Sequence, residues 1–141
     1  MEKNIKMVAV DVDGTFVRSD YTYDVPRFKR ILSAMKNAGC HFVVASGNQY
    51  YQLRDLFPGY YDELSFVAEN GAFVKDRKEL IFTADMPKET VDFVIDVCRE
   101  YPEVQNVLCG VNSAYCQREN VSQEFFDLTG IYYHRLQWVD D

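Results

Sequence analysis

Asp11 and Asp13 directly follow the apolar run MVAV at residues 7–10. In an extended chain, side chains two positions apart point to the same side, so these carboxylates lie close together and their mutual repulsion favours a bound cation. Carboxylate oxygens are hard ligands, which indicates Mg²⁺ as that cation. Gly14 permits a sharp turn that brings backbone N–H groups near an anion, and the Thr15 hydroxyl can donate a hydrogen bond to it. The segment is therefore a candidate site for a cation and a negatively charged ligand.

The same segment has a simpler interpretation, a turn that ends a strand. Asp, Gly and Thr all favour turns, whatever their function. A turn does not need two acids directly after a fully apolar strand, however, and ligands of open α/β sheets bind outside the carboxyl ends of strands. We therefore favour the functional interpretation of Asp11 and Asp13.

A second polar cluster follows the apolar run at residues 41–45. It consists of Ser46, Gly47 and Asn48, at the predicted start of a helix. A hydroxyl and the backbone N–H groups of a helix N-terminus would together form an anion site. Ser46 could equally be only the N-cap of that helix.

The elements that position these clusters follow from hydrophobic periodicity. A third apolar run, at residues 65–68, leads into Glu69-Asn70-Gly71, and three strands that all end in small polar residues are hard to attribute to capping alone. Residues spaced as on one helix face separate the runs. The predicted order is strand, helix, strand, helix, strand, over residues 7–10, 25–35, 41–45, 48–57 and 65–68. Two consecutive crossover units predict a parallel, doubly wound α/β sheet whose strands are covered on both faces.

The pattern changes after Gly71. Residues 73–74 and 80–82 flank a polar stretch and predict an antiparallel hairpin. We place a boundary within 83–87 and expect two domains, 1–84 and 85–141. The second has an α+β pattern, with helices over about 87–101 and 122–128 and strands over 107–110, 114–116 and 131–136.

The composition excludes several classes of protein. The 141 residues are 48% apolar, and 15 Lys and Arg stand against 22 Asp and Glu, a formal charge of −7. Such a chain can bury a core, and its acidic balance counts against a nucleic-acid partner. We find no signal-peptide pattern and no apolar stretch long enough for a membrane, so we expect a soluble protein of the cytoplasm. The four cysteines lack metal-finger spacing and are interpreted as buried free thiols.

The three polar clusters, taken in order, resemble a known family. They are similar to motifs in the first half of Cof-type phosphatases of the haloacid dehalogenase (HAD) superfamily. The matching segments are DVDGT at 11–15, ASGN at 45–48 and AENGA at 68–72. Similarity to bacterial sugar phosphatases of that type lies in FVVASGNQYYQL at 42–53, CG at 109–110 with SAY at 113–115, and YHRL at 133–136. The resemblance implies the N-terminal part of a parallel HAD-like Rossmannoid core, followed by the start of an α+β cap of type IIB.

The resemblance also implies a reaction, the Mg²⁺-dependent hydrolysis of a small phosphomonoester such as a sugar phosphate. Asp11 would be the nucleophile that takes the phosphoryl group as an aspartyl-phosphate, and Asp13 would protonate the leaving oxygen and then activate water. The Asp11 carboxylate and the main-chain carbonyl of Asp13 would hold Mg²⁺. The substrate would be bound by Gly14, Thr15, Ser46, Gly47, Asn48 and Asn70.

The sequence departs from the family pattern in two respects. Many relatives have Arg where Asn48 stands, so this position offers no direct charge contact. The family's phosphate-pairing lysine and its acidic Gly-Asp-x-x-x-Asp loop, both of which follow the cap, are not among the 141 residues. Lys75, Lys78 and Lys88 lie where the family lysine does not occur, and we interpret them as solvated charges. We therefore expect an N-terminal portion of such a phosphatase, with weak or no activity of its own.

Two other functions stay open at this point. A phosphomutase or phosphotransferase would use the same aspartyl-phosphate and pass the group to a sugar hydroxyl instead of water. A non-catalytic fragment would need neither step. In the second domain, Asn112 and Ser113 are interpreted chiefly as turn residues, and the run at 132–134, with His134, as part of a strand.

The strand at residues 7–10 has a further implication. In the family, strands that follow the cap pair beside this first strand. Without them it lies at an edge of the sheet, and Val8 and Val10 lose the helices that cover them. We therefore expect self-association through this edge, or marginal stability.

Overall fold

Two α/β units follow one another along the chain. The computed structural model describes residues 4–119 and 121–140, and its two units are Met1–Thr83 and Ala84–Asp141. The division falls inside the segment 83–87, where the sequence pattern changes. The predicted fold class, α/β, is confirmed.

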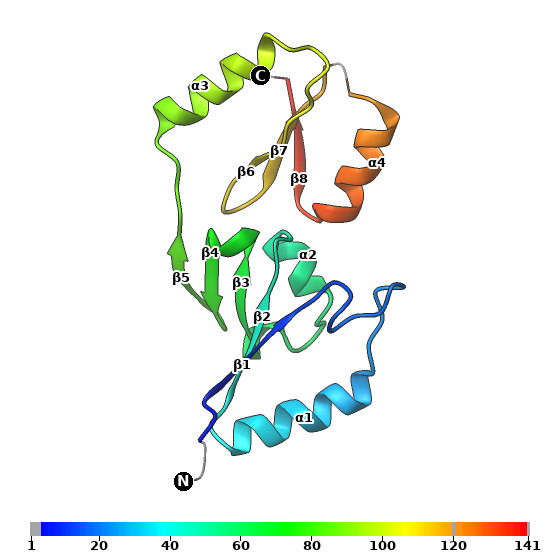
Figure 1. Ribbon diagram of the computed structural model, residues 1–141, viewed down its shortest axis with the longest axis vertical. Helices are drawn as coiled ribbons and strands as arrows, with labels where there is room; N and C mark the ends of the chain where they lie inside the picture. The colour runs from blue at the N-terminus through cyan, green and yellow to red at the C-terminus, as the bar shows by residue number, and fades with distance from the viewer. Residues whose placement is uncertain (1–3, 120, 141) are drawn as a thin grey trace. The chain divides into compact units, whose positions relative to one another are not determined.

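The first unit is built on a five-stranded mixed sheet (Figure 1). Strands β1 to β5 stand in chain order, so each strand pairs with the next one along the sequence. The first three strands are parallel, and the last two form an antiparallel hairpin; their bounds are Met7–Asp11, His41–Ala45, Ser65–Ala68, Phe73–Asp76 and Glu79–Thr83. The three predicted parallel strands and the predicted hairpin are confirmed.

Two helices connect the parallel strands, α1 (Val25–Asn37) and α2 (Tyr50–Asp55). Helix α1 begins after Asp24, whose side chain accepts a hydrogen bond of 2.9 Å from the backbone N–H of Arg27. Helix α2 is shorter than the predicted range 48–57. Residues before Tyr50 instead form a turn in which the N–H of Asn48 donates to Oγ of Ser46. At the other end, the N–H groups of Leu56 and Phe57 make 3₁₀-type hydrogen bonds to carbonyls three residues earlier. Single 3₁₀ turns, Tyr61–Glu63 and Glu69–Gly71, flank β3.

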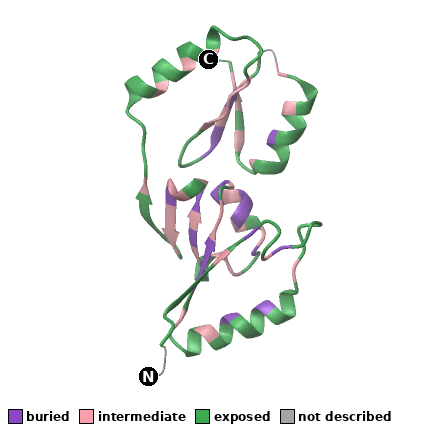
Figure 2. Ribbon diagram, viewed as in Figure 1, coloured by how far each residue is buried: buried purple, intermediate pink, exposed green. Residues whose placement is uncertain are grey.

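Both helices of the first unit pack on one face of its sheet. Partners in register point to the same side, so Phe42 of β2 and Phe66 of β3 share that face. The ring of Phe28 in α1 lies 5.4 Å from that of Phe42, and the ring of Tyr50 in α2 lies 5.3 Å from that of Phe66. The buried residues of this unit accordingly gather in β2, β3 and α2 (Figure 2).

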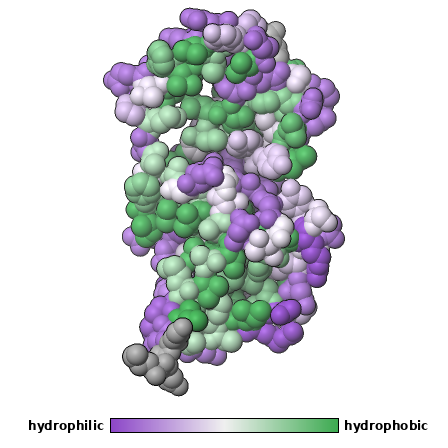
Figure 3. All heavy atoms as spheres, viewed as in Figure 1, coloured by the Kyte–Doolittle hydropathy of each residue, from purple (hydrophilic) through white to green (hydrophobic). Residues whose placement is uncertain are grey.

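Strand β1 lies at the edge of this sheet and is largely exposed. Among the described residues its hydrogen-bonded neighbour is β2 alone, and Met7 and Val8 are 60% and 38% exposed. The prediction of a strand covered on both faces is therefore wrong for β1, because both helices lie on one side and centre on β2 and β3. Figure 3 shows hydrophobic side chains reaching the surface in both units.

The second unit has a three-stranded sheet and two helices. In the sheet, β7 pairs antiparallel with β6 and parallel with β8. Phe126 of α4 stacks on Trp138 of β8 with ring centroids 5.4 Å apart. In chain order the elements are α3 (Lys88–Arg99), β6 (Leu108–Cys109), β7 (Ala114–Gln117), α4 (Gln123–Tyr132) and β8 (Leu136–Val139).

The predicted strand over residues 131–136 is wrong. Ile131 and Tyr132 are the last residues of α4, and β8 begins only at Leu136. The run of β-branched and aromatic residues favours a strand locally, but Phe125 and the buried Thr129 follow the four-residue spacing of one helix face. His134 consequently lies between α4 and β8, outside any strand.

Two further expectations concern the burial of the cysteines and the presence of membrane-spanning helices. All four thiols are free, but only Cys116 is buried and Cys109 is exposed, so the prediction of buried thiols is wrong in general. Within residues 4–119 and 121–140, no helix combines the length and the apolar character that a membrane crossing needs.

Candidate active site

The segment after β1 is a tight turn closed around one carbonyl oxygen. Val12 is fully buried, and its carbonyl accepts hydrogen bonds of 3.3, 3.0 and 3.0 Å from the N–H groups of Thr15, Phe16 and Val17. Gly14 has a φ of +70°, in the left-handed region that favours glycine. These three N–H groups are therefore already hydrogen-bonded within the turn. The side chain of Thr15 is exposed, so its hydroxyl rather than its N–H can reach a ligand.

Asp11 and Asp13 lie on either side of the buried Val12. Asp11 is the last residue of β1 and stands in register with Ala45 of β2, and both Asp residues are exposed. The carboxylate of Asp13 has a fixed partner, since its Oδ2 accepts a hydrogen bond of 2.8 Å from Nδ2 of Asn48. This contact joins the end of β1 to the end of β2.

Both the backbone N–H and the hydroxyl of Ser46 take part in hydrogen bonds. Its N–H donates to the carbonyl of Val67 in β3 at 3.0 Å, and its Oγ accepts the N–H of Asn48 at 3.2 Å. The alternative in which Ser46 caps the helix is wrong, because the residue that precedes α2 is Gln49. A hydroxyl that accepts one hydrogen bond still has a proton to donate, so Ser46 can also bind an anion.

The end of β3 has a left-handed backbone over three consecutive residues. The φ angles of Glu69, Asn70 and Gly71 are +52°, +55° and +90°. The N–H of Glu69 donates to the carbonyl of Asn48 at 3.1 Å, which joins the end of β3 to that of β2. The Asn70 amide lies against Gly47, so that a Cβ at position 47 would stand 2.8 Å from Oδ1 of Asn70.

These contacts bring the predicted residues of three strand ends into one cluster. Sequence reasoning missed the contact between Asp13 and Asn48 and the Val12 carbonyl that closes the turn. The residue types indicated that polar groups would meet at this edge, but side-chain torsions decide which of them bond. The residues joined by contacts are Asp13, Ser46, Gly47, Asn48 and Asn70, and Asp11, Gly14 and Thr15 belong to the same turn as Asp13.

A family model covers nearly all of this chain. The model of haloacid dehalogenase-like hydrolases matches residues 8–138. The chain belongs to this family. The resemblance found in the sequence is therefore confirmed.

Individual HAD-family proteins match the chain over almost its whole length. The chain is 41% identical over 138 residues to 5-amino-6-(5-phospho-D-ribitylamino)uracil phosphatase YbjI of Escherichia coli. The alignment covers 98% of the chain and 51% of YbjI. The crystal structure of SMU.1108c from Streptococcus mutans superposes with a TM-score of 0.87 and 33% identity, over 97% of the chain and 52% of SMU.1108c. The chain spans about half the length of these relatives.

A more distant HAD structure shares the fold alone. The subclass IIB sugar phosphatase BT4131 superposes with a TM-score of 0.66 at 17% identity, over 95% of the chain and 52% of BT4131. The α/β fold of this chain therefore matches that of the subclass IIB phosphatases over their N-terminal half.

The residues of the candidate site fit part of a magnesium site. Within the described residues, no group of three or more His, Cys, Asp or Glu side chains could hold a metal ion. Mg²⁺ in enzymes is often bound by only one or two carboxylates, with water and substrate phosphate as its other ligands. The exposed carboxylate of Asp11 would supply one such ligand, and the main-chain carbonyl of Asp13 would supply a further oxygen from the same turn.

Other residues considered from the sequence have structural partners of their own. Ser113 is buried, and its hydroxyl donates to the carbonyl of Ala114 at 3.0 Å. Lys75 lies over the ring of Tyr50, 4.9 Å from its centroid, so it is not simply a solvated charge. Lys78 pairs with Asp62 and Lys88 with Asp92, at 3.5 and 2.6 Å.

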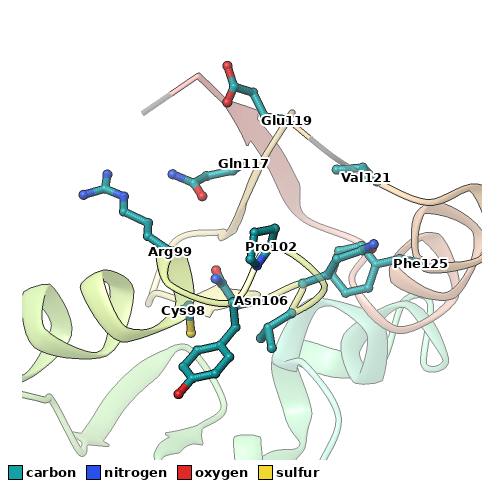
Figure 4. Close-up of a pocket in the computed structure, with 11 residues that line it drawn as sticks. Cys98, Arg99, Pro102, Asn106, Gln117, Glu119, Val121 and Phe125 are labelled. Atoms are coloured by element: carbon teal, nitrogen blue, oxygen red, sulfur yellow. The ribbon is translucent and has the colours of Figure 1, made fainter.

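A separate hollow of about 350 Å³ lies within the second unit (Figure 4). It is formed by the end of α3, the segment 101–106, the end of β7 and the start of α4. Its walls mix apolar side chains such as Pro102 and Phe125 with polar ones such as Arg99 and Glu119. All the residues that line it belong to the second unit.

Proposed function

We propose that this chain carries the nucleophile and the acid/base of a Mg²⁺-dependent phosphatase that hydrolyses small phosphomonoesters, with sugar phosphates as its substrate class. Asp11 is the nucleophile and Asp13 the acid and base. The observation that carries the proposal is the hydrogen bond between Asn48 and Asp13, because it fixes one of the two carboxylates that flank Val12 at the end of β1. Two neighbouring carboxylates with different surroundings suit a reaction in which one attacks and the other transfers a proton.

The reaction has two steps. A carboxylate oxygen of Asp11 attacks phosphorus, the P–O bond to the leaving group breaks, and protonated Asp13 gives its proton to the leaving oxygen. Asp13, now ionised, takes a proton from water, whose oxygen attacks the same phosphorus. The bond from phosphorus to Asp11 then breaks and inorganic phosphate leaves. In a phosphotransferase a sugar hydroxyl would replace the water of the second step.

The other residues of the cluster bind the transferring group. The hydroxyls of Ser46 and Thr15 and the amide of Asn70 are the donors for its oxygens, and Gly14 and Gly47 keep side chains out of its way. Mg²⁺ held by the Asp11 carboxylate and the main-chain carbonyl of Asp13 would offset the negative charge of substrate and carboxylates.

The relatives support a sugar-phosphate class of substrate. The name of YbjI gives its substrate as a phosphate ester of a ribityl chain joined to a uracil ring. The identity of 41% over nearly the whole chain makes phosphorylated sugars and sugar alcohols the first compounds to test. We take the second unit, residues 84–141, to be the start of the cap domain.

The proposal is tested by phosphate release from p-nitrophenyl phosphate, ribose 5-phosphate and the YbjI substrate. We expect release that requires Mg²⁺ and is abolished by EDTA and by Asp11→Asn. The rate is compared with that of YbjI measured in parallel.

Circular dichroism of Asp11→Asn provides the control for folding. A folded Asp11→Asn protein with undiminished turnover would contradict the mechanism. Turnover equal to that of YbjI would contradict the expected weakness of the chain. Isomerisation of a phosphosugar without phosphate release would favour the phosphomutase.

A further inference from the structure

We propose that Asn48 is a positioning residue that holds the carboxylate of Asp13 in place for proton transfer, an inference that rests on the proposed phosphatase function. Its Nδ2 donates to Oδ2 of Asp13 at 2.8 Å. A carboxylate accepts and an amide N–H donates, so the direction of this bond is fixed while Asp13 is ionised. The sequence had placed Asn48 among the substrate-binding residues instead.

The main chain of Asn48 is anchored at both of its polar groups. Its N–H donates to Oγ of Ser46 at 3.2 Å, and its carbonyl accepts the N–H of Glu69 at 3.1 Å. Only the two side-chain torsions of Asn48 are then left to set the position of the amide. The donor is therefore held in place before substrate arrives, and Asp13 loses little further freedom when it reacts.

The contact also distinguishes the two oxygens of Asp13. Oδ2 is occupied by the amide of Asn48, which leaves Oδ1 to carry the proton to the leaving group and to accept it from water. Without this contact the carboxylate of Asp13, an exposed side chain, would sample other rotamers. Errors of about 1 Å in the position of a reacting group can lower a rate ~10²-fold.

The first test separates proton transfer from substrate binding. Asn48→Ala should lower kcat roughly 10- to 100-fold with an alkyl phosphate, whose leaving oxygen needs a proton, and less with p-nitrophenyl phosphate, while KM stays within about twofold. Asn48→Asp should lower kcat further, since it replaces the donor by a like charge. The exposed Asn37, at the end of α1, gives the matched control Asn37→Ala, which should behave as wild type. An increase in KM at constant kcat would overturn the proposal in favour of a substrate contact.

A double-mutant cycle tests whether Asn48 acts through Asp13. In an Asp13→Ala background, Asn48→Ala should have no further effect on kcat, because there is no carboxylate left to hold. Full additivity of the two substitutions would overturn the proposal.

The closing experiment needs no turnover. In the ¹⁵N-labelled chain, Asp13→Ala should shift the side-chain amide signals of Asn48 and leave those of Asn37 in place. Unmoved Asn48 signals would overturn the positioning role, whatever the activity. If the shift is found but folded Asp11→Asn retains full turnover, the proposed function fails while the contact itself stands.

Discussion

Oδ1 of Asn70 occupies the space beside Gly47, so close that a Cβ on Gly47 would lie 2.8 Å from it. Gly47 follows β2 and Asn70 follows β3, so the absence of a side chain at one strand end allows the amide at the next to come close. Gly47 needs no left-handed backbone, because its φ is not among the positive ones. The close approach of Asn70 is therefore a sufficient structural reason for glycine at position 47.

The first prediction concerns Gly47→Ala. The new methyl group must push the Asn70 amide aside, which a short side chain at the surface can do, so the free energy of unfolding should fall by less than about 1 kcal/mol. Phosphate release should fall more strongly, since Asn70 is a proposed donor to the phosphoryl group. Urea unfolding and phosphate release on the same preparations measure both effects.

The control for Gly47→Ala is the same change made in an Asn70→Ala background. The clash is absent there, so Gly47→Ala should have almost no additional effect on stability. An equal stability loss in both backgrounds would show that the methyl group collides with something other than Asn70.

The second prediction concerns Gln52 in helix α2. This side chain is 3% exposed, and within the described residues its Oε1 has no hydrogen-bond partner. Gln52→Met keeps the length of the side chain and removes the buried acceptor, so the free energy of unfolding should rise by about 1 kcal/mol. Chemical unfolding measures it, with Gln137→Met on the exposed side of β8 as the control. A loss of stability would contradict the prediction.

The third prediction concerns the pH dependence of the second unit. Burial, with a smaller contribution from Cys109, raises the pKa of the Cys116 thiol from 9.0 to about 11. The unfolded thiol therefore ionises at lower pH than the folded one, and the stability that Cys116 contributes is complete below pH 9 and is lost as the pH rises from 9 to about 11. Trp138, the one tryptophan of the chain, reports unfolding by its fluorescence.

Cys116→Val supplies the comparison, because other groups also titrate in this range. The variant should lose less stability than wild type as the pH rises from 9 to about 11, since valine has no proton to lose. Equal slopes in the two proteins would contradict the raised pKa.

The fourth prediction concerns the edge strand β1. Its outer backbone groups and the exposed Met7 offer a template for another chain, and lysine at such an edge is a common means of preventing this. We expect the weight-average mass in sedimentation to rise with concentration, and Met7→Lys to reduce the effect. Ile81→Lys, on the opposite edge strand β5, shows whether that second edge also contributes to association. A stable, cooperatively folding monomer at all concentrations would show that β1 is protected.

The elements predicted from the sequence are those whose own residues determine them. The run at 42–45 is apolar and forms most of β2, which pairs with a strand on each side, and the spacing of Phe28 and Leu32 marks the buried face of α1. Residues 131–132 were misassigned because their strand propensity is local, whereas their place in α4 depends on packing. The exposure of β1 reflects its position at the edge of the sheet, which an apolar run does not reveal.

The candidate site was predictable at the level of strand ends. Parallel strands bring their carboxyl ends to one edge, so the approach of Asp13, Asn48 and Asn70 followed from the order of the elements. The pairing of Asn48 with Asp13 did not, because it depends on the turn that the Val12 carbonyl closes and on the anchored backbone of Asn48. Such details arise from tertiary geometry rather than from residue type.

The backbone at Glu69, Asn70 and Gly71 winds in the sense that D-amino acids prefer. Glycine has no handedness and asparagine tolerates this conformation, but an L-glutamate bears a cost of about 1–2 kcal/mol there. A chemically assembled chain with D-alanine at position 69 should therefore hold the end of β3 with less strain than the natural one. At position 69, mirror-image stereochemistry is the better match to the fold.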